Sequence, residues 1–169
     1  AAHGIAVGNF SQRFNKKVSE DLVKTTINAD VVIEELRGGS IKTTGISSMD
    51  CSDLAINGRF TIKPGAISLM QWNRGDQSKT YGIYMIGSNN TISITSADID
   101  DSKNGSLSDL IKTDESLWGG KTEKNVLRIG GSTLKVKENQ KERYLIRAAK
   151  AFRTFINLNN DASPIGISK

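Results

Sequence analysis

Apolar and polar residues alternate through residues 23–33, VKTTINADVVI. One row of alternate positions holds Val23, Thr25, Ile27, Ala29, Val31 and Ile33, and the other holds Lys24, Thr26, Asn28, Asp30 and Val32. A period of two is typical of a β-strand with one buried face and one solvated face. The pattern therefore predicts one long amphipathic strand over residues 23–33.

Short apolar or alternating segments separated by turn residues continue along the chain. They cover residues 41–48, 54–62, 66–72, 80–87, 91–95, 125–129 and 133–137. Seven or eight strands at this spacing favour a β-sandwich or barrel over alternating strand–helix units, and no repeat of fixed period is visible. We therefore predict a mainly antiparallel β domain built as a two-sheet sandwich.

The segment LAINGRFTI, residues 54–62, carries a hairpin signal. Asn57-Gly58 lies between Leu54 and Ile56 on one side and Phe60 and Ile62 on the other. Asn-Gly is favoured in type I′ turns because both residues tolerate positive φ. The pattern predicts a two-residue loop joining two antiparallel strands.

The segment at residues 139–161 interrupts the strand pattern. Read as a helix, it places one apolar stripe at Leu145, Ala148, Ala149, Phe152, Phe155 and Ile156. Read as a strand, it has apolar groups on both faces, so the helix is preferred. The predicted organisation is an extended N-terminal arm at 1–22, a β-sandwich domain at 23–158 with a helix as the preferred interpretation of its C-terminal segment, and a tail at 159–169.

Composition limits the chemistry that can be expected. The 169 residues include one cysteine, Cys51, and one histidine, His3, so an internal disulfide or a thiolate metal cluster cannot form. His3 is expected to be an exposed terminal residue. Imidazole-based acid–base chemistry lacks its usual group, and no carboxylate or lysine pair has a distinctive spacing. We therefore expect no enzymatic activity, no catalytic residues, no metal site and no cofactor.

An acidic stretch, DDSKNGSLSDLI at residues 100–111, begins like a calcium-binding loop. Asp100, Ser102, Asn104 and Gly105 fit the first positions of that loop. Its twelfth position is Ile111, where the loop needs a bidentate Glu. A solvated acidic turn is the preferred interpretation.

A basic stretch at residues 135–153 contributes to the net charge of +5. An anionic partner, either nucleic acid or a membrane surface, is one interpretation of this patch; a solvated helix face is the other. The residues predicted to meet such a partner are Lys141, Arg143, Arg147, Lys150 and Arg153.

The arrangement of segments resembles the pilin subunits of bacterial chaperone–usher fimbriae. A polar leader precedes the amphipathic strand at 23–33, short strands follow, and Trp118, Leu127 and Ile129 mark a late strand. The resemblance implies an incomplete immunoglobulin-like sandwich completed by the N-terminal arm of a neighbouring subunit. It places donor-arm contacts at Phe10, Phe14 and Val18.

The same resemblance implies a function and a location. The protein would be a structural or adhesive subunit of a fimbria at the extracellular cell surface, assembling by donor-strand exchange. Its partners would be copies or neighbouring subunits of the fibre, a periplasmic chaperone and a host-cell receptor. The alternative from the residues alone is a basic α+β module that engages nucleic acid or a membrane through its C-terminal segment.

Overall fold

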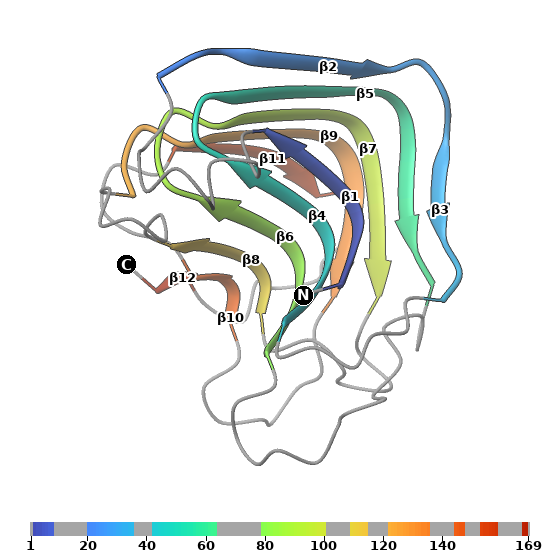
Figure 1. Ribbon diagram of the computed structural model, residues 1–169. Helices are drawn as coiled ribbons and strands as arrows, with labels where there is room; N and C mark the ends of the chain where they lie inside the picture. Colours follow the sequence, from blue (N-terminus) through green and yellow to red (C-terminus); the bar gives the residue numbers. More distant parts are fainter. Residues whose placement is uncertain are drawn as a thin grey trace.

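The computed structural model consists of β-strands wound into successive turns (Figure 1). It describes residues 2–8, 20–35, 42–63, 79–100, 109–114, 122–135, 144–147, 153–158 and 167–168. The strands are β1 (Ala2–Gly8), β2 (Val23–Ile27), β3 (Val31–Ile33), β4 (Lys42–Met49), β5 (Ser52–Ile62), β6 (Lys79–Ile86), β7 (Thr91–Asp100), β8 (Asp109–Asp114), β9 (Val126–Lys135), β10 (Tyr144–Arg147), β11 (Arg153–Leu158) and β12 (Ile167–Ser168).

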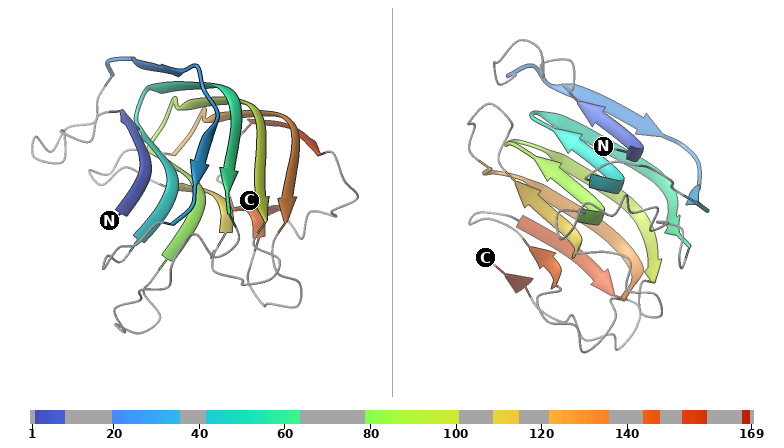
Figure 2. Two further views of the ribbon diagram at one scale, coloured as in Figure 1. Left: turned by 90° about the vertical axis from the view of Figure 1, so that its right-hand side faces the viewer. Right: turned by 60° about the horizontal axis from the view of Figure 1, so that its bottom comes forward.

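The strands form two parallel sheets. Sheet A has the order β1-β4-β6-β8-β10-β12, and sheet B has the order β11-β9-β7-β5-β2, with β3 also paired to β5. The chain passes from a strand of sheet A to a strand of sheet B and then returns, so that β4 with β5, β6 with β7, and β8 with β9 each form one rung. Figure 2 shows these rungs side by side in sequence order. The fold is a parallel β-solenoid.

This architecture corrects the predicted fold class. The chain is mainly β and has two sheets, but every strand pair that the structure describes is parallel, so the antiparallel immunoglobulin-like sandwich is wrong. Alternation of apolar and polar residues reports which face of a strand is buried, and it is the same for parallel and antiparallel neighbours. The pattern therefore identified strands without giving their relative direction.

Isoleucines lie opposite one another on successive rungs. In sheet A the register pairs Ile5 with Ile46, Ile46 with Ile83, and Ile83 with Ile111. We call these four residues the sheet A isoleucine column. In sheet B the register pairs Ile27 with Ile56, Ile56 with Ile94, and Ile94 with Ile129, which form the sheet B isoleucine column.

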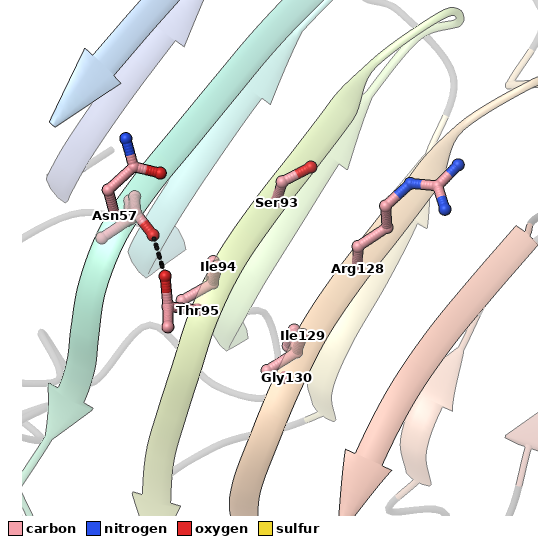
Figure 3. Close-up of a pocket in the computed structure, with 8 residues that line it drawn as sticks. Asn57, Ser93, Ile94, Thr95, Arg128, Ile129 and Gly130 are labelled. Atoms are coloured by element: carbon pink, nitrogen blue, oxygen red, sulfur yellow. Dashed lines mark hydrogen bonds between the residues drawn. The ribbon is translucent and has the colours of Figure 1, made fainter. Parts of the chain in front are cut away.

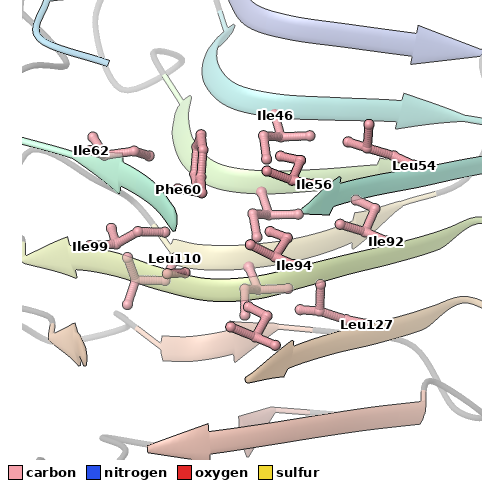
Figure 4. Packing of buried hydrophobic residues seen from close by; sticks show 14 of the residues in the cluster. Ile46, Leu54, Ile56, Phe60, Ile62, Ile92, Ile94, Ile99, Leu110 and Leu127 are labelled. Carbon is pink, nitrogen blue, oxygen red and sulfur yellow. The ribbon is translucent and has the colours of Figure 1, made fainter. Parts of the chain in front are cut away.

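The two isoleucine columns help to build one hydrophobic core between the sheets (Figure 4). Ile46 and Ile83 from sheet A and Leu54 from sheet B have no exposed surface. Phe60 is equally buried where sheet B bends. Stacked, close-packed side chains of this kind make each rung depend on its neighbours for burial.

The predicted hairpin at Asn57-Gly58 is wrong, because both residues lie inside the single strand β5. Sheet B bends here from the top of the molecule down its right-hand side in Figure 1. The register between β5 and β7 shifts at this point, between Ile56 and Arg59. A Cβ on Gly58 would lie 2.4 Å from the carbonyl oxygen of Ala29, so the glycine permits close approach of β5 to the backbone between Ile27 and Val31.

The strand predicted at residues 23–33 is divided at the same bend into β2 and β3. Asn28 and Asp30 lie at the division. Asn57 Nδ2 donates to Asn28 Oδ1 at 2.7 Å, and the backbone N–H of Arg59 donates to Asp30 Oδ1 at 2.8 Å. The side-chain oxygens of Asn28 and Asp30, on the first rung, thus accept hydrogen bonds from residues at the bend of β5.

The C-terminal helix prediction is also wrong where the chain is described. Residues 144–147 form β10, paired in parallel with β8, and residues 153–158 form β11, paired in parallel with β9. Apolar residues at successive positions suit a strand of this fold as well as a helix, because periodicity does not separate the two for short apolar runs.

Most of the remaining strand predictions are confirmed. Residues 41–48, 80–87 and 91–95 largely coincide with β4, β6 and the first half of β7. The two segments at 125–129 and 133–137 are parts of one strand, β9. The strand predicted at 66–72 lies outside the described residues.

Asparagines fill the corner at which the chain turns from sheet A into sheet B. Asn90 is completely buried and Asn125 is nearly so. Asn90 Nδ2 donates to the carbonyl oxygen of Ile86 at 2.9 Å and to Asn125 Oδ1 at 3.0 Å. Asn125 Nδ2 donates to the carbonyl oxygen of Gly87 at 2.9 Å. The two amides thereby satisfy backbone carbonyl groups of this turn.

Candidate functional site

A shallow groove crosses the outer face of sheet B where the sheet bends, and polar side chains stand along a lining that is mostly apolar (Figure 3). Its volume is about 340 Å³, and it spans β5, β7 and β9. It is lined by Ile56, Asn57, Ser93, Ile94, Thr95, Arg128, Ile129 and Gly130. We call it the sheet B groove.

Three stacked tripeptides build the sheet B groove. They are Ala55-Ile56-Asn57 on β5, Ser93-Ile94-Thr95 on β7, and Arg128-Ile129-Gly130 on β9, and the register aligns their isoleucines. The central isoleucine of each points into the core, so the flanking residues face outward. Alternation along each strand thus places polar side chains at matching positions on neighbouring strands.

The groove presents neutral hydrogen-bonding groups and one cation. Asn57, Thr95 and Arg128 are exposed, and Ser93 is partly exposed. Ser93 is the register neighbour of Arg128, which sets a hydroxyl and a guanidinium on adjacent strands. Neighbouring strands lie about 4.8 Å apart, so a ligand lying across them meets a new polar group at each strand.

Gly130 lets β9 approach β7 closely where both strands line the groove. A Cβ at this position would lie 2.0 Å from the carbonyl oxygen of Thr95, a separation that no side chain can adopt without displacing the backbone. The close approach of β9 to β7 here requires glycine. The resulting surface has hydroxyl and amide groups at its sides and backbone beneath.

The groove can bind but lacks a proton-transfer group among its lining residues. Hydroxyls and amides are donors and acceptors that do not titrate near neutral pH, and an arginine guanidinium stays protonated. Positioned acid–base catalysis needs a group whose pKa lies near the working pH. The lining residues therefore offer a ligand hydrogen bonds and one positive charge.

A second polar cluster joins the first two rungs in sheet A. Nδ1 of His3 lies 2.7 Å from Ser47 Oγ and 3.2 Å from Thr44 Oγ1, and Ser47 Oγ donates to Thr44 Oγ1 at 3.0 Å. The expectation that His3 is an exposed terminal residue is wrong, because it is partly buried within β1. Ser47 has no exposed surface, so its hydroxyl cannot reach a substrate, and the cluster links strands.

This cluster makes the stability of the fold depend on pH. Burial lowers the pKa of His3 below its ordinary value of 6.5, so the folded state favours the neutral imidazole. The unfolded chain then binds more protons as the pH falls below 6.5. We expect full stability from this group above pH 6.5 and a loss of stability as the pH falls toward the folded-state pKa.

Chemical denaturation across this range, with His3→Asn as the control, measures the effect. The wild type should lose stability relative to His3→Asn as the pH falls, because Asp50 and the other acids are present in both proteins and only the wild type carries the imidazole. An identical pH dependence in both proteins would show that His3 does not carry it.

The corner between the sheets holds the single thiol. Asp50 and Cys51 both have positive φ, 37° and 54°, in this tight turn. Burial raises the pKa of Cys51, and the carboxylate of Asp50 raises it further, which disfavours the reactive thiolate. Burial also raises the pKa of Asp50, whose Oδ1 accepts the backbone N–H of Ser88 at 3.1 Å. This corner has a structural role.

The site residues predicted from the sequence lie elsewhere or outside the described residues. The donor-arm residues Phe10, Phe14 and Val18 lie outside them, as do Lys141, Arg143 and Lys150. Arg147 lies in β10 of sheet A, and Arg153 lies in β11, which borders β9 in sheet B; neither residue is among those that line the sheet B groove. The acidic stretch at 100–111 is described only at its two ends.

Sequence reasoning missed the groove residues although a signal was present. Each tripeptide has an isoleucine between two outward residues, in AIN, SIT and RIG. These triplets are separated by unequal lengths of chain, so a search for a fixed period does not align them. Alignment on the isoleucine alone would have placed Asn57 beside Thr95 and Ser93 beside Arg128.

Comparison of the chain with protein-family models, curated proteins and solved structures found no match. In the part of the chain that the structure describes, no helix has the length and apolarity to cross a membrane. Over the same residues, no three His, Cys, Asp or Glu side chains are grouped so as to hold a metal ion. The sheet B groove is the candidate site that the geometry supports best.

Proposed function

We propose that the protein is a structural or adhesive surface protein that holds a partner in the sheet B groove without changing it chemically. The observation that carries the proposal is the stacking of three tripeptides that present Asn57, Ser93, Thr95 and Arg128 on adjacent strands. A row of polar groups along the axis of a solenoid suits an extended partner.

The groove is fixed before any partner arrives. Its polar residues stand on hydrogen-bonded strands whose inward neighbours, Ile56, Ile94 and Ile129, are almost fully buried. Thr95 Oγ1 also donates to the carbonyl oxygen of Ile56, at 3.4 Å. Sites on regular strands hold their groups more precisely than sites on loops, and preorganisation reduces the entropy lost on binding.

Assembly into a fibre by exchange of residues 1–22 stays a prediction, as does the extracellular location. Within that stretch, β1 pairs with β4 of its own chain, from Ala2 with Thr43 to Gly8 with Met49. Donation of β1 to another subunit would require this pairing to be given up. Adhesion through the sheet B groove requires no such exchange.

Adhesion under flow tests the proposal. Beads coated with the full chain are passed over surfaces bearing neutral polysaccharides, acidic polysaccharides or extracellular-matrix proteins. We expect retention on at least one surface and its loss in Thr95→Tyr, because the ring fills the groove while tyrosine remains favourable in a strand. Thr61→Tyr, an outward position on β5 outside the groove, is the matched control and should retain adhesion.

The outcomes separate the classes of protein. Retention that is equal in the wild type and Thr95→Tyr would show that the groove is not the adhesive site. Absence of retention on every surface would overturn the adhesive function. Release of smaller products from a coated surface would show that the protein is an enzyme.

A further inference from the structure

We propose that the sheet B groove binds an acidic oligosaccharide, with its carboxylate on Arg128 and its hydroxyls on Asn57, Ser93 and Thr95. The inference rests on the proposed function and names the class of partner. It follows from three features of the groove: the nature of its single charge, the nature of its neutral groups, and its direction across the strands.

The charge of the groove favours an anionic ligand. Arg128 is the one charged residue among those that line it, and its side chain is exposed. The planar guanidinium matches a carboxylate through two parallel hydrogen bonds. Arg59, also exposed, lies two residues beyond Asn57 on β5 and adds a second cation to the same outer face.

The neutral groups favour a ligand rich in hydroxyls. The hydroxyl of Ser93 can donate and accept, and the amide of Asn57 has a second N–H beside the one that it donates to Asn28. The hydroxyl of Thr95 donates to the carbonyl oxygen of Ile56, so it offers a ligand an acceptor. Sugar hydroxyls both donate and accept, so they can match groups of either kind. A ligand that carried hydrogen-bond acceptors alone would leave the acceptor oxygens of the groove without a donor.

The same groups disfavour nucleic acid. Proteins that bind single strands combine a dense row of cations with aromatic side chains on which bases stack. The residues lining the groove include one cation and no aromatic ring. An anionic charge carried on some sugar units, separated by neutral hydroxyls, fits this sparse arrangement better.

The direction of the groove favours an extended chain. Asn57, Thr95 and Gly130 follow one another on β5, β7 and β9, and Ser93 and Arg128 form a parallel row on β7 and β9 (Figure 3). A ligand between the rows lies across the strands, along the axis on which the rungs stack.

Titration calorimetry on the full chain tests the inference with defined probes. The probes are a linear hexuronic acid hexamer, the neutral hexose hexamer of the same linkage, and a short single-stranded DNA. We expect the acidic hexamer to bind about tenfold or more tightly than the neutral one, because one charge-assisted bidentate pair is worth that factor. The DNA should bind more weakly than the acidic hexamer.

Variants assign the contacts. Arg128→Gln should weaken binding of the acidic hexamer about tenfold and abolish its advantage over the neutral hexamer, and Arg128→Lys should restore part of it. Lys24→Gln changes an exposed cation on β2, outside the groove, and is the control for net charge. Thermal unfolding of each variant is measured alongside, so that a loss of binding is separated from a loss of stability.

Each outcome decides between possibilities. Equal affinity for the acidic and neutral hexamers, tighter binding of the DNA, or no binding of any probe would overturn the acidic-saccharide assignment. Bead adhesion that depends on Thr95 but is not inhibited by the acidic hexamer would leave the adhesive function standing and reject this ligand. Binding of the hexamer without bead adhesion would keep the ligand and reject the adhesive function.

Discussion

Ile83→Ala should lower the free energy of unfolding by about 2–5 kcal/mol, the usual cost of truncating a buried isoleucine. Ile83 has no exposed surface, and in the sheet A isoleucine column it lies between Ile46 and Ile111. The truncation leaves a cavity bordered by both register neighbours, which the parallel backbones cannot close by moving independently. Urea denaturation followed by circular dichroism measures the change.

The control for this effect is Ile5→Ala in the same column. Ile5 is only partly buried, on the strand at the end of sheet A, so its truncation should cost clearly less. Ile83→Val should cost about 0.5–1.5 kcal/mol. If Ile5→Ala and Ile83→Ala were equally destabilising, the position within the column would not determine the cost.

Asn90→Ala should cost about 3 kcal/mol, through lost hydrogen bonds rather than lost volume. The side chain of Asn90 bonds to the carbonyl oxygen of Ile86 and to Asn125 Oδ1, and its Oδ1 lies 3.4 Å from the backbone nitrogen of Ser52. Each buried group left without a partner costs about 1–3 kcal/mol. Thermal or urea unfolding measures the loss.

Asn57→Ala makes the same chemical change at an exposed position and should alter stability by no more than about 0.5 kcal/mol. The single hydrogen bond that Asn57 makes to Asn28 is exposed to water, which replaces it. Equal losses in the two variants would show that the buried amides do not secure the corner between the sheets.

The strands were largely predictable from the sequence, but their arrangement was not. Residues such as Ile92 and Ile94 alternate with polar neighbours because one face of β7 is buried. That requirement is local, whereas the direction of the neighbouring strand depends on how the intervening chain returns. The connections from sheet B back to sheet A leave from Ile62, Asp100 and Lys135 and reach Lys79, Asp109 and Tyr144, and their lengths differ.

Unequal connections also hid the repeat. The separation of register-paired isoleucines in sheet A ranges from 21 residues, between Ile146 and Ile167, to 41 residues, between Ile5 and Ile46. A solenoid is usually recognised by a fixed period, which here is absent. The groove could not be predicted for the same reason, since it is made by residues from three rungs that only the register brings together.

The hairpin prediction at Asn57-Gly58 was wrong because a hairpin turn and a bend within one strand favour the same residues. A hairpin uses Asn-Gly for its positive φ, and the bend of β5 uses Gly58 for its missing Cβ against Ala29. Asn57 then supplies an outward amide to the groove. The dipeptide signals a change of direction, and the remainder of the fold decides whether the chain reverses or bends.

The order of strands in sheet B should make the groove strands open less often than the strands at the ends of the sheet. β5, β7 and β9 each have a hydrogen-bonded neighbour on both sides, whereas β2 and β11 lie at the two ends of the sheet. In a quasi-one-dimensional stack, fluctuations open terminal units more readily than internal ones. Amide hydrogens of the groove strands should therefore exchange with solvent more slowly than those of β2 or β11. The groove stays assembled while the outer strands fray and close again, so a ligand seated there would not be released by the commonest openings of the fold.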